Sequence, residues 1–305
     1  MIVHSASFMS SPAHSVPRSR PWLRSLLRQS IIGLTWLSGR LLATAEWLRW
    51  VRLRYVWLKP RRGDIYIATS PKAGTTWMQM IVFQLVTQGR GEFEHINQVS
   101  PFLELLPRDA TTEPLLDSLP SPRILKSHLP FQQLKPPRHS RIIYVTRNAA
   151  DSLGSLYHHH CLMEATPLPF EGYFRVVMDV ENPWLGHLES WWPHRKDANV
   201  LHVRYEDLIE NLEAGVRRVA AFCELPIDES RLGNILERCG IAYMKQHNER
   251  FDMRGPQAAL QGRGTFIHQG GVGQGRAKLS EEQRAELDTR VVRARQRLGM
   301  VATEP

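Results

Sequence analysis

Residues 64–77, DIYIATSPKAGTTW, contain the pattern from which the fold can be predicted. The first six residues form a short apolar run rich in β-branched side chains, and the run stops at Ser70. From Thr75 the apolar residues follow a helical period, and Gly89 offers a place for that helix to end. A buried strand, a short turn and a helix are therefore predicted. Turns of this kind bind phosphate, because the start of the helix offers unpaired N–H groups and a partial positive charge.

The predicted turn carries side chains that suit an anion. Gly74 allows close approach of the backbone, and the neighbouring Thr75 and Thr76 supply hydroxyl donors. The standard Walker pattern places lysine directly before serine or threonine, whereas Lys72 precedes Gly74. The turn therefore resembles a phosphate loop without matching that of a triphosphatase. An ordinary strand-to-helix turn with an incidental lysine is the alternative interpretation.

Similar apolar runs recur at three further places, which are residues 123–126, 141–146 and 199–203. Helical patterns lie between or after them, at residues 205–223 and from Ser280, where a Ser-x-x-Gln capping box begins a helix that ends near Gly299. Short buried strands that alternate with helices indicate a parallel sheet covered on both faces. The predicted fold class is α/β, a P-loop-like three-layer sandwich with a central parallel sheet flanked by helices.

Two of these predicted strands are followed by polar side chains. Arg147 follows one strand, and Ser155 lies two helical turns farther on, so both can face the same anion. Lys126 and His128 stand at the end of another strand. Because the usual pKa of histidine lies near neutral pH, His128 is a candidate general base. Each of these residues taken alone is more often a solvated or salt-bridged surface group.

The cysteines and histidines do not follow a metal-binding pattern. Three cysteines, at positions 161, 223 and 239, form no close pair, so neither a disulfide framework nor a zinc site is expected. The triplet His158–His160 follows a predicted helix without Asp or Glu at ligand spacing. We interpret the triplet as pocket-lining or surface residues, and we predict no metal. The free cysteines favour a reducing, cytoplasmic compartment.

The positive charge of the chain is concentrated near the N-terminus. The 305 residues have a formal net charge of +9, yet residues 1–62 alone hold eleven Arg and Lys against Glu46. The remainder of the chain therefore has a net charge of −1. A nucleic-acid-binding protein would carry its basic residues on the folded body, so nucleic acid is not predicted as a partner.

Residues 1–60 are predicted to form a basic amphipathic N-terminal extension, and residues 61–305 the main domain. Within residues 21–58, Trp, Leu and Ile recur at helical spacing with Arg between them. This pattern suits either peripheral contact with an anionic membrane or helices that pack on the body. A secretory signal with a cleavage site at residues 43–45 is a third alternative. A membrane span is not predicted, because the apolar run 31–42 is short and contains Arg40.

Taken together, these motifs resemble the cytosolic-type sulfotransferases, which transfer a sulfuryl group from 3′-phosphoadenosine 5′-phosphosulfate (PAPS) to a hydroxyl or amine. The resemblance covers most of residues 63–285. The segments that carry it, in the expected order, are SPKAGTTW (70–77), LKSHLP (125–130), YVTRNAADSLGSLYHH (144–159), VRYEDL (203–208) and FIHQGGVG (266–273). Residues 61–305 would then be the sulfotransferase domain, and the enzyme would be PAPS-dependent and need no metal.

The resemblance also implies a role for each matching residue. His128 would accept the proton of the acceptor, Lys126 would stabilise the sulfuryl charge, and Lys72 would contact the 5′-phosphate and the bridging oxygen. The residues implied in donor binding are Lys72, Ala73, Gly74, Thr75, Thr76, Trp77, Arg147, Ser155, Tyr205 and Gly270. Among them Trp77 and Tyr205 would contact adenine, and Arg147 with Ser155 would hold the 3′-phosphate. Segments 101–106 and 161–174 are predicted to line the pocket of a hydrophobic small-molecule or lipid-like acceptor.

The chain departs from the family near its C-terminus. Where the family commonly has Arg-Lys-Gly followed by Gly-Asp-Trp-Lys, this chain has His268-Gln269-Gly270 and then Gly273-Gln274-Gly275-Arg276. The 3′-phosphate site therefore loses charge. A kinase with a variant phosphate loop and a non-catalytic membrane-surface protein are the alternative functions. The short C-terminal dimer motif of the family is not recognisable, so that dimer is not predicted.

Overall fold

The computed structural model describes residues 44–45, 48–107, 109–179, 182–254, 264–268 and 270–301. The chain divides into two compact units, residues 1–55 and 56–305. The first unit is helical at its described residues 48–52, and a π-helical turn, η1 (Leu53–Trp57), crosses the boundary. The predictions made for residues 1–43 lie outside the described residues. Among the described residues, no helix combines the length and the apolar character needed to cross a bilayer.

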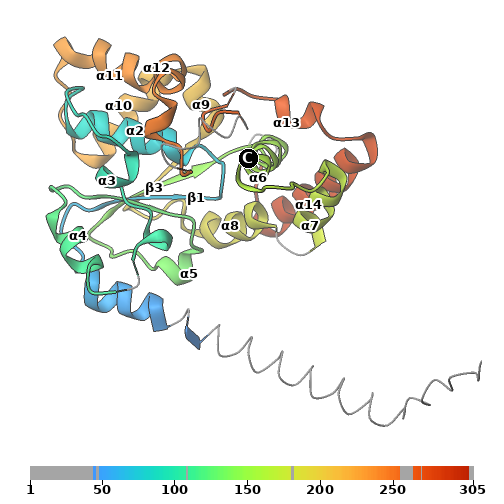
Figure 1. Ribbon diagram of the computed structural model, residues 1–305, viewed down its shortest axis with the longest axis horizontal. Helices are drawn as coiled ribbons and strands as arrows, with labels where there is room; N and C mark the ends of the chain where they lie inside the picture. The colour runs from blue at the N-terminus through green and yellow to red at the C-terminus, as the bar shows by residue number, and fades with distance from the viewer. Residues whose placement is uncertain are drawn as a thin grey trace, which may run out of the picture. The chain divides into compact units, whose positions relative to one another are not determined.

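The second unit is built on a four-stranded parallel sheet (Figure 1). Its strands are β1 (Ile65–Thr69), β2 (Ile124–Ser127), β3 (Arg141–Thr146) and β4 (Val200–Arg204), in the order β2-β1-β3-β4. All three pairings are parallel, so the carboxyl ends of the strands share one edge. All four runs predicted as strands from the sequence form strands, within one residue at each end.

Helices connect these strands and surround them. In chain order they are α2 (Thr75–Val86), α3 (Ile96–Val99), η2 (Leu103–Leu105), α4 (Thr112–Ser118), α5 (Phe131–Leu134), α6 (Ala149–Met163), α7 (Phe170–Asp179), α8 (Pro183–Trp191), η3 (Trp192–His194), α9 (Tyr205–Glu210), α10 (Leu212–Cys223), η4 (Glu229–Arg231), α11 (Leu232–Cys239), α12 (Ile241–Gln246), η5 (Asn248–Arg250), α13 (Gln274–Ala277) and α14 (Glu281–Leu298).

Both faces of the sheet are buried. On one face, Ile65 and Ile67 of β1 belong to a cluster that includes buried residues of α2, α10 and α11. On the other face, the ring of Tyr144 from β3 lies against Trp191 of α8, with centroids 5.7 Å apart. Figure 1 shows α2, α10 and α11 on one side of the strands and α8 on the other. The three layers and the parallel sheet confirm the predicted fold class.

Two helix predictions need correction. Residues 205–223 form two helices rather than one, because Asn211 is extended (φ −148°, ψ 91°) and its side chain accepts a hydrogen bond from the Ala214 N–H at the start of α10. The histidines 158–160 lie inside α6 and do not follow a helix. The hydrogen bond of the Asn211 side chain to the local backbone competes with helix continuation, which explains the break between α9 and α10.

Other helix ends agree with the sequence. Ser280 and Gln283 form the predicted capping box of α14, and Gly299 ends that helix in the left-handed conformation. The helix α2 ends at Val86, and the Gly89 N–H then bonds the Gln84 carbonyl at 2.8 Å. Gly89 therefore closes the turn after α2, as a glycine with positive φ commonly does.

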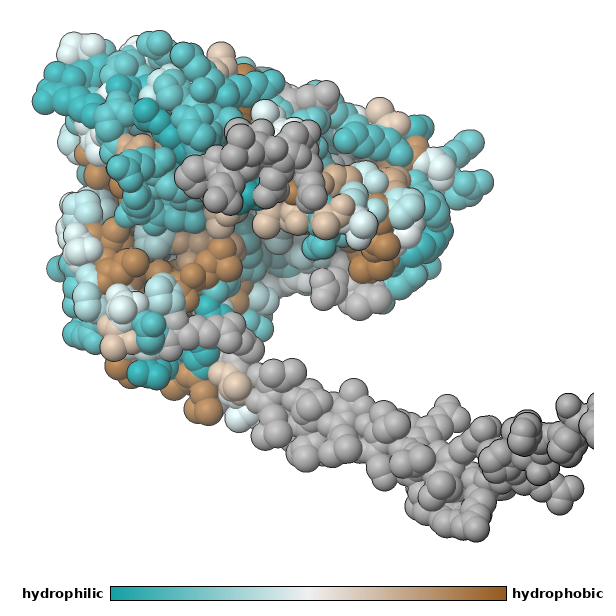
Figure 2. Space-filling view, in the orientation of Figure 1, coloured by the Kyte–Doolittle hydropathy of each residue, from teal (hydrophilic) through white to brown (hydrophobic). Residues whose placement is uncertain are grey.

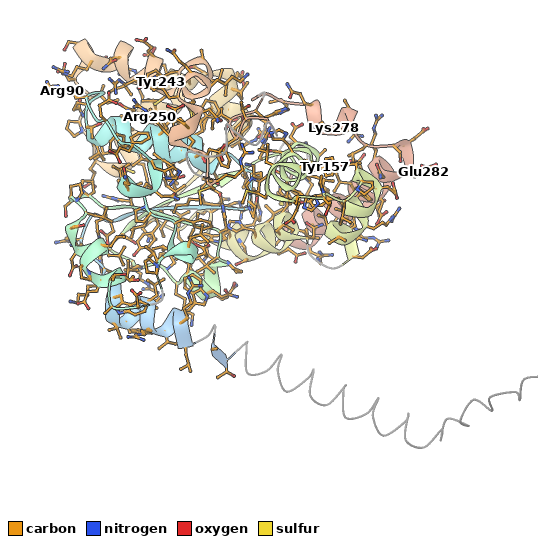
Figure 3. All side chains as sticks on the ribbon, viewed as in Figure 1. Arg90, Tyr157, Tyr243, Arg250, Lys278 and Glu282 are labelled. Atoms are coloured by element: carbon orange, nitrogen blue, oxygen red, sulfur yellow. The ribbon has the colours of Figure 1, made fainter. Side chains whose placement is uncertain are left out.

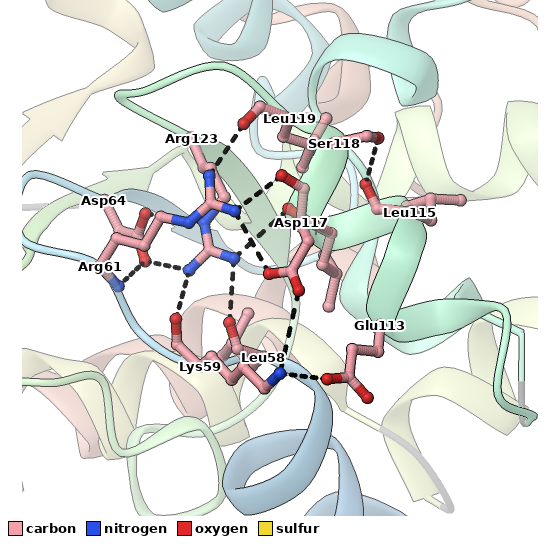
Figure 4. A network of polar contacts seen from close by, with 11 residues as sticks. Leu58, Lys59, Arg61, Asp64, Glu113, Leu115, Asp117, Ser118, Leu119 and Arg123 are labelled. Carbon is pink, nitrogen blue, oxygen red and sulfur yellow. Dashed lines mark hydrogen bonds and ion pairs between the residues drawn. The ribbon is translucent and has the colours of Figure 1, made fainter.

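A polar network fixes the starts of β1 and β2 (Figure 4). The guanidinium of Arg123 donates to both carboxylate oxygens of Asp64, at 2.9 and 2.6 Å, and to the carbonyls of Leu58 and Lys59. Both side chains of this ion pair are buried. Loss of either partner would leave an uncompensated buried charge, at a cost of about 3–5 kcal/mol. The pair thus joins two neighbouring strands at the end opposite to the site described below.

Candidate functional site

A cavity of about 650 Å³ opens at the carboxyl ends of the strands. Most residues singled out in the sequence line it, and these are Lys72, Gly74, Thr75, Thr76, Trp77, Lys126, His128, Arg147, Ser155, Tyr205 and Gly270. Among the described residues predicted to bind the donor, Ala73 is the one that does not line the cavity. Its side chain is buried, and its N–H bonds the Ser70 carbonyl at 3.3 Å, which shapes the turn. Of the segments predicted to line the acceptor pocket, 101–106 contributes Phe102 and Leu105, and 161–174 contributes Met163 alone.

The turn between β1 and α2 has a backbone that requires glycine. Gly74 has φ +99°, and a Cβ atom added there would lie 2.6 Å from the Tyr205 ring. Lys72 also adopts a left-handed conformation, with φ +64°. Among the described residues, no side chain caps the first turn of α2. The N–H groups at this helix start, together with the nearby cations, therefore make a favourable place for an anion.

Two lysines, each packed on an aromatic ring, face this cavity. The Lys72 ammonium lies 4.4 Å from the centroid of Phe266, and the Lys126 ammonium lies 4.1 Å from that of Phe102. Burial lowers the pKa of Lys72 to about 7, with smaller contributions from the charges of Lys126 and Arg147. Burial likewise lowers the pKa of Lys126 to about 8. A buried ammonium group has lost part of its hydration, so a bound anion stabilises its charged form. Both lysines therefore favour an anionic ligand in this cavity.

His128 is held in one orientation. Its Nδ1 atom lies 2.8 Å from the Thr69 carbonyl, which can only accept, so Nδ1 carries the proton and Nε2 keeps a lone pair. The ring also packs edge-on against Phe102, with centroids 4.9 Å apart. Burial, and then the charge of Lys126, holds the pKa of His128 well below its usual value. His128 is therefore neutral near pH 7 and can accept a proton on Nε2.

Arg147 organises the opposite corner of the cavity. Its guanidinium donates to the carbonyls of Lys72 and Gly271, both at 3.1 Å, and lies 4.2 Å from the centroid of the Tyr205 ring. Tyr205 in turn meets Trp77 edge-on at 5.2 Å. The stacked cation and rings form an aromatic wall with one positive charge, which suits a nucleobase beside a phosphate.

The segment after residue 264 makes contacts that were not predicted from the sequence. Asp151 of α6 accepts hydrogen bonds from the N–H groups of Gly273 and Gly275, at 2.8 and 2.7 Å. This contact draws the glycine-rich loop against α6, and Lys278, labelled in Figure 3, joins the cavity lining. Arg276 is instead paired with Asp288 of α14 at 2.8 Å. The glycines at 154 and 275, where the two backbones approach closely, are a signal of this contact in the sequence.

His159, which the sequence left as a lining or surface residue, lines the cavity. Its ring meets Phe266 edge-on, with centroids 5.8 Å apart. His268 also lines the cavity and packs on His158, with ring centroids 3.9 Å apart. Burial lowers the pKa of both His159 and His268 to about 4. These histidines are neutral near pH 7, so they do not replace the charge of the missing Arg-Lys pair.

The chain matches the family model described as "Sulfotransferase domain" over residues 62–299. The chain belongs to the sulfotransferase family. Mouse sulfotransferase 1 family member D1 is 35% identical over 199 residues, which cover 61% of this chain and 68% of the mouse protein. Human sulfotransferase 1C2 is 32% identical over 228 residues, which cover 71% of this chain and 76% of the human protein. The expected family and enzyme class, a PAPS-dependent sulfotransferase, are confirmed.

Solved sulfotransferase structures share the fold. A retinol dehydratase in complex with androsterone and the inactive cofactor PAP superposes with a TM-score of 0.66 at 19% identity, covering 81% of this chain and 84% of that one. A mouse sulfotransferase complexed with PAP gives a TM-score of 0.61 at 20% identity, with 78% and 86% covered. At these identities the likeness concerns the fold, and it confirms the P-loop-like arrangement.

Proposed function

We propose that this sulfotransferase moves a sulfuryl group from PAPS to a hydroxyl of a hydrophobic small-molecule or lipid-like acceptor. The observation that carries the proposal is His128, whose Nδ1–H is held by the Thr69 carbonyl at 2.8 Å in the cavity that it shares with Lys72 and Lys126. A histidine in this tautomer offers Nε2 as a general base. The two lysines match the negative charge that develops during sulfuryl transfer.

The donor fits the residues of the cavity at both ends. The turn at residues 72–77 binds the 5′ end through Lys72, the hydroxyls of Thr75 and Thr76, and the first N–H groups of α2. Arg147 and Ser155 bind the 3′-phosphate, and Trp77 with Tyr205 contacts the adenine. Gly270, which lies near Tyr205, lets the backbone approach that end of the donor.

The reaction follows from these positions. Nε2 of His128 takes the proton of the acceptor hydroxyl while its oxygen forms a bond to sulfur, and the bond from sulfur to the 5′-phosphate oxygen breaks. Lys72 stabilises the negative charge that appears on that phosphate oxygen, and Lys126 faces the sulfuryl oxygens. The products are a sulfate ester and PAP, and the proton passes from His128 to solvent. No step requires a metal.

The acceptor is apolar on this proposal. Phe102, Leu105, Met163 and Met253 line the cavity, so an aliphatic or aromatic body would replace water there. On the face seen in Figure 2, hydrophobic side chains gather around α3, while the outer surfaces of α11 and α12 are hydrophilic. The retinol dehydratase mentioned above binds androsterone, which is an apolar alcohol of this class.

The domain organisation and location belong to the same proposal. Residues 61–305 form the sulfotransferase domain of a cytoplasmic enzyme, and residues 1–60 form the extension. The basic, Trp-rich stretch 21–58 brings the domain to anionic membranes and so to lipid-like acceptors. Co-sedimentation with anionic liposomes tests this part, and binding that is unchanged after deletion of residues 1–52, which leaves the Leu58 and Lys59 acceptors of Arg123 in place, would contradict it.

Two measurements on the intact chain test the catalytic proposal. Calorimetric titration with PAP and, separately, with ATP and Mg²⁺ distinguishes a sulfotransferase from a kinase, and a clear preference for ATP would overturn the proposal. Mass spectrometry of products from PAPS and a mixture of phenols, sterols and aliphatic alcohols then identifies the acceptor. Turnover that disappears in Lys72→Ala and His128→Ala excludes a non-catalytic binding protein.

A further inference from the structure

Residues 101–104 cross the end of the strand that carries Lys126. The Lys126 N–H donates to the Pro101 carbonyl at 3.0 Å, and Phe102 forms an isolated parallel bridge with Lys126. The Phe102 ring then covers the Lys126 ammonium on its face and meets the His128 ring on its edge. The segment that the sequence assigned to the acceptor pocket therefore also holds both catalytic side chains.

Glu104 completes this contact at the point where β2 ends. Its Oε1 accepts the Ser127 hydroxyl at 3.0 Å and also accepts the His128 N–H. Ser127 Oγ in turn accepts the Leu129 N–H at 3.0 Å. Beyond the end of a strand these N–H groups have left the sheet ladder, so they need other acceptors. The Glu104 carboxylate thus fixes the His128 N–H directly and the Leu129 N–H through the Ser127 hydroxyl.

We infer that Glu104 is a positioning residue for sulfuryl transfer: its carboxylate fixes the His128 main chain so that Nδ1 meets the Thr69 carbonyl, and its charge keeps Lys126 protonated. This inference rests on the proposed roles of His128 and Lys126. It assigns to Glu104 no contact with donor or acceptor, because Glu104 acts through its neighbours.

Electrostatics around Glu104 support this assignment. Burial raises the pKa of Glu104 to about 7, and the hydrogen bonds from His128 and Ser127 and the charge of Lys126 oppose that rise. In the other direction, Glu104 is the group that raises the pKa of Lys126 against the effect of burial. The other charged or titratable groups that face His128 are Lys72 and His187, and both disfavour its protonation. In its ionised form Glu104 therefore offsets part of the positive charge beside Lys126.

Two variants of Glu104 separate its hydrogen bond to His128 from its charge beside Lys126. Glu104→Gln keeps an oxygen acceptor for the His128 N–H and removes the charge, whereas Glu104→Ala removes both. We expect Glu104→Gln to shift the alkaline limb of the pH profile of kcat by roughly one unit toward lower pH, because Lys126 loses its proton earlier. We expect Glu104→Ala to lower kcat about 100-fold through misplacement of His128, with the Kd for PAP changed less than twofold.

Two matched controls accompany them. Ser127→Ala removes the hydroxyl donor and leaves the charge, so the alkaline limb should stay in place. Glu94→Gln changes an exposed carboxylate whose partner is Gln98, and it should change neither kcat nor the pH profile. If Glu104→Gln left the alkaline limb in place, or Glu104→Ala retained the kcat of the unmodified enzyme, the inference would be overturned.

A readout without turnover keeps this test apart from the test of function. In protein with ¹³C-labelled lysine, NMR titration follows the pKa of Lys126, assigned with a Lys126→Arg variant. We expect that pKa to fall in Glu104→Gln and to be unchanged in Ser127→Ala. If the Lys126 pKa falls in Glu104→Gln but the unmodified protein transfers no sulfuryl group, the proposed function is overturned and the electrostatic coupling between Glu104 and Lys126 stands. If the Lys126 pKa were unchanged in Glu104→Gln while the unmodified enzyme transfers the sulfuryl group, the inference about Glu104 would be overturned and the proposed function would stand.

Discussion

The two ends proposed for the donor, the 5′ end at Lys72 and the 3′ end at Arg147, are built in different ways, although both are suited to a phosphate. At the 5′ end, Lys72, Thr75 and Thr76 belong to one strand-turn-helix segment, and Gly74 makes the turn possible. At the 3′ end, Arg147 and Ser155 come from α6 and its approach, and the loop after residue 264 is drawn in by Asp151. The first end is local in sequence. The second is assembled from segments more than 100 residues apart.

The two ends also differ in how many cations each holds, and therefore in how a substitution at each end would affect the donor. At the 5′ end Lys72 and the helix start act together, so a substitution there removes the main positive charge. At the 3′ end His268 is neutral and Arg276 is turned toward Asp288, so Arg147 carries most of the charge with help from the exposed Lys278. We therefore expect unequal effects of matched substitutions at the two ends.

The largest expected effect is at Lys72. Lys72→Ala should lower kcat/KM about 1000-fold, because the leaving phosphate oxygen loses its fixed positive charge. Steady-state kinetics with saturating acceptor measure the loss, and circular dichroism checks the fold. His268→Ala, which removes a neutral side chain at the other end, is the comparison and should lower kcat/KM by less than tenfold. Comparable losses in both variants would mean that the positive charge of the cavity is not concentrated at Lys72.

Gly275 tests how closely the loop must approach α6. A Cβ atom at Gly275 would lie 2.0 Å from the Ala150 carbonyl oxygen, so the backbone would have to move. Gly275→Ala should destabilise the protein by about 1–3 kcal/mol and weaken PAP binding. Gly172→Ala is the control, because nothing lies within 4 Å of a Cβ atom there. Equal melting temperatures for the two variants would contradict the close approach.

The pH dependence of PAP binding tests the 5′ end. Lys72 has a pKa of about 7 in the free protein, and a bound anion favours its protonated form. Affinity should therefore be highest below pH 7 and fall by up to about tenfold per pH unit above it. Calorimetric titrations from pH 6 to 8.5 measure the slope. The slope should vanish in Lys72→Ala; a slope that persists there would assign the titration to another group.

The smallest expected effect is at Lys278, an exposed cation at the 3′ end. Lys278→Ala should weaken PAP binding about fivefold, as expected for an exposed ion pair. Binding of 5′-AMP, which lacks the 3′-phosphate, should be unaffected. Competition titrations with the two nucleotides measure the ratio. Equal weakening of both would mean that Lys278 does not serve the 3′ end.

Much of the fold could be predicted because its signals are local. The apolar runs that became β1 to β4 have the length and composition of buried strands, and the capping box at Ser280 is a short-range motif. The break at Asn211 was missed because the periodicity of Leu208 and Val216 continues across it. Its cause is one side-chain hydrogen bond, which periodicity does not report.

The sequence alone also determined that Lys72, Lys126, His128 and Arg147 would meet, because each lies at or just after the end of a strand and parallel strands share one carboxyl edge. Only the tertiary structure decided the tautomer of His128, the hydrogen bond of its N–H to the Glu104 carboxylate, and the contact of the glycine loop with Asp151. These features depend on contacts between residues 24 to 124 positions apart. Such contacts leave no local period in the chain, so they appear only when packing brings the segments together.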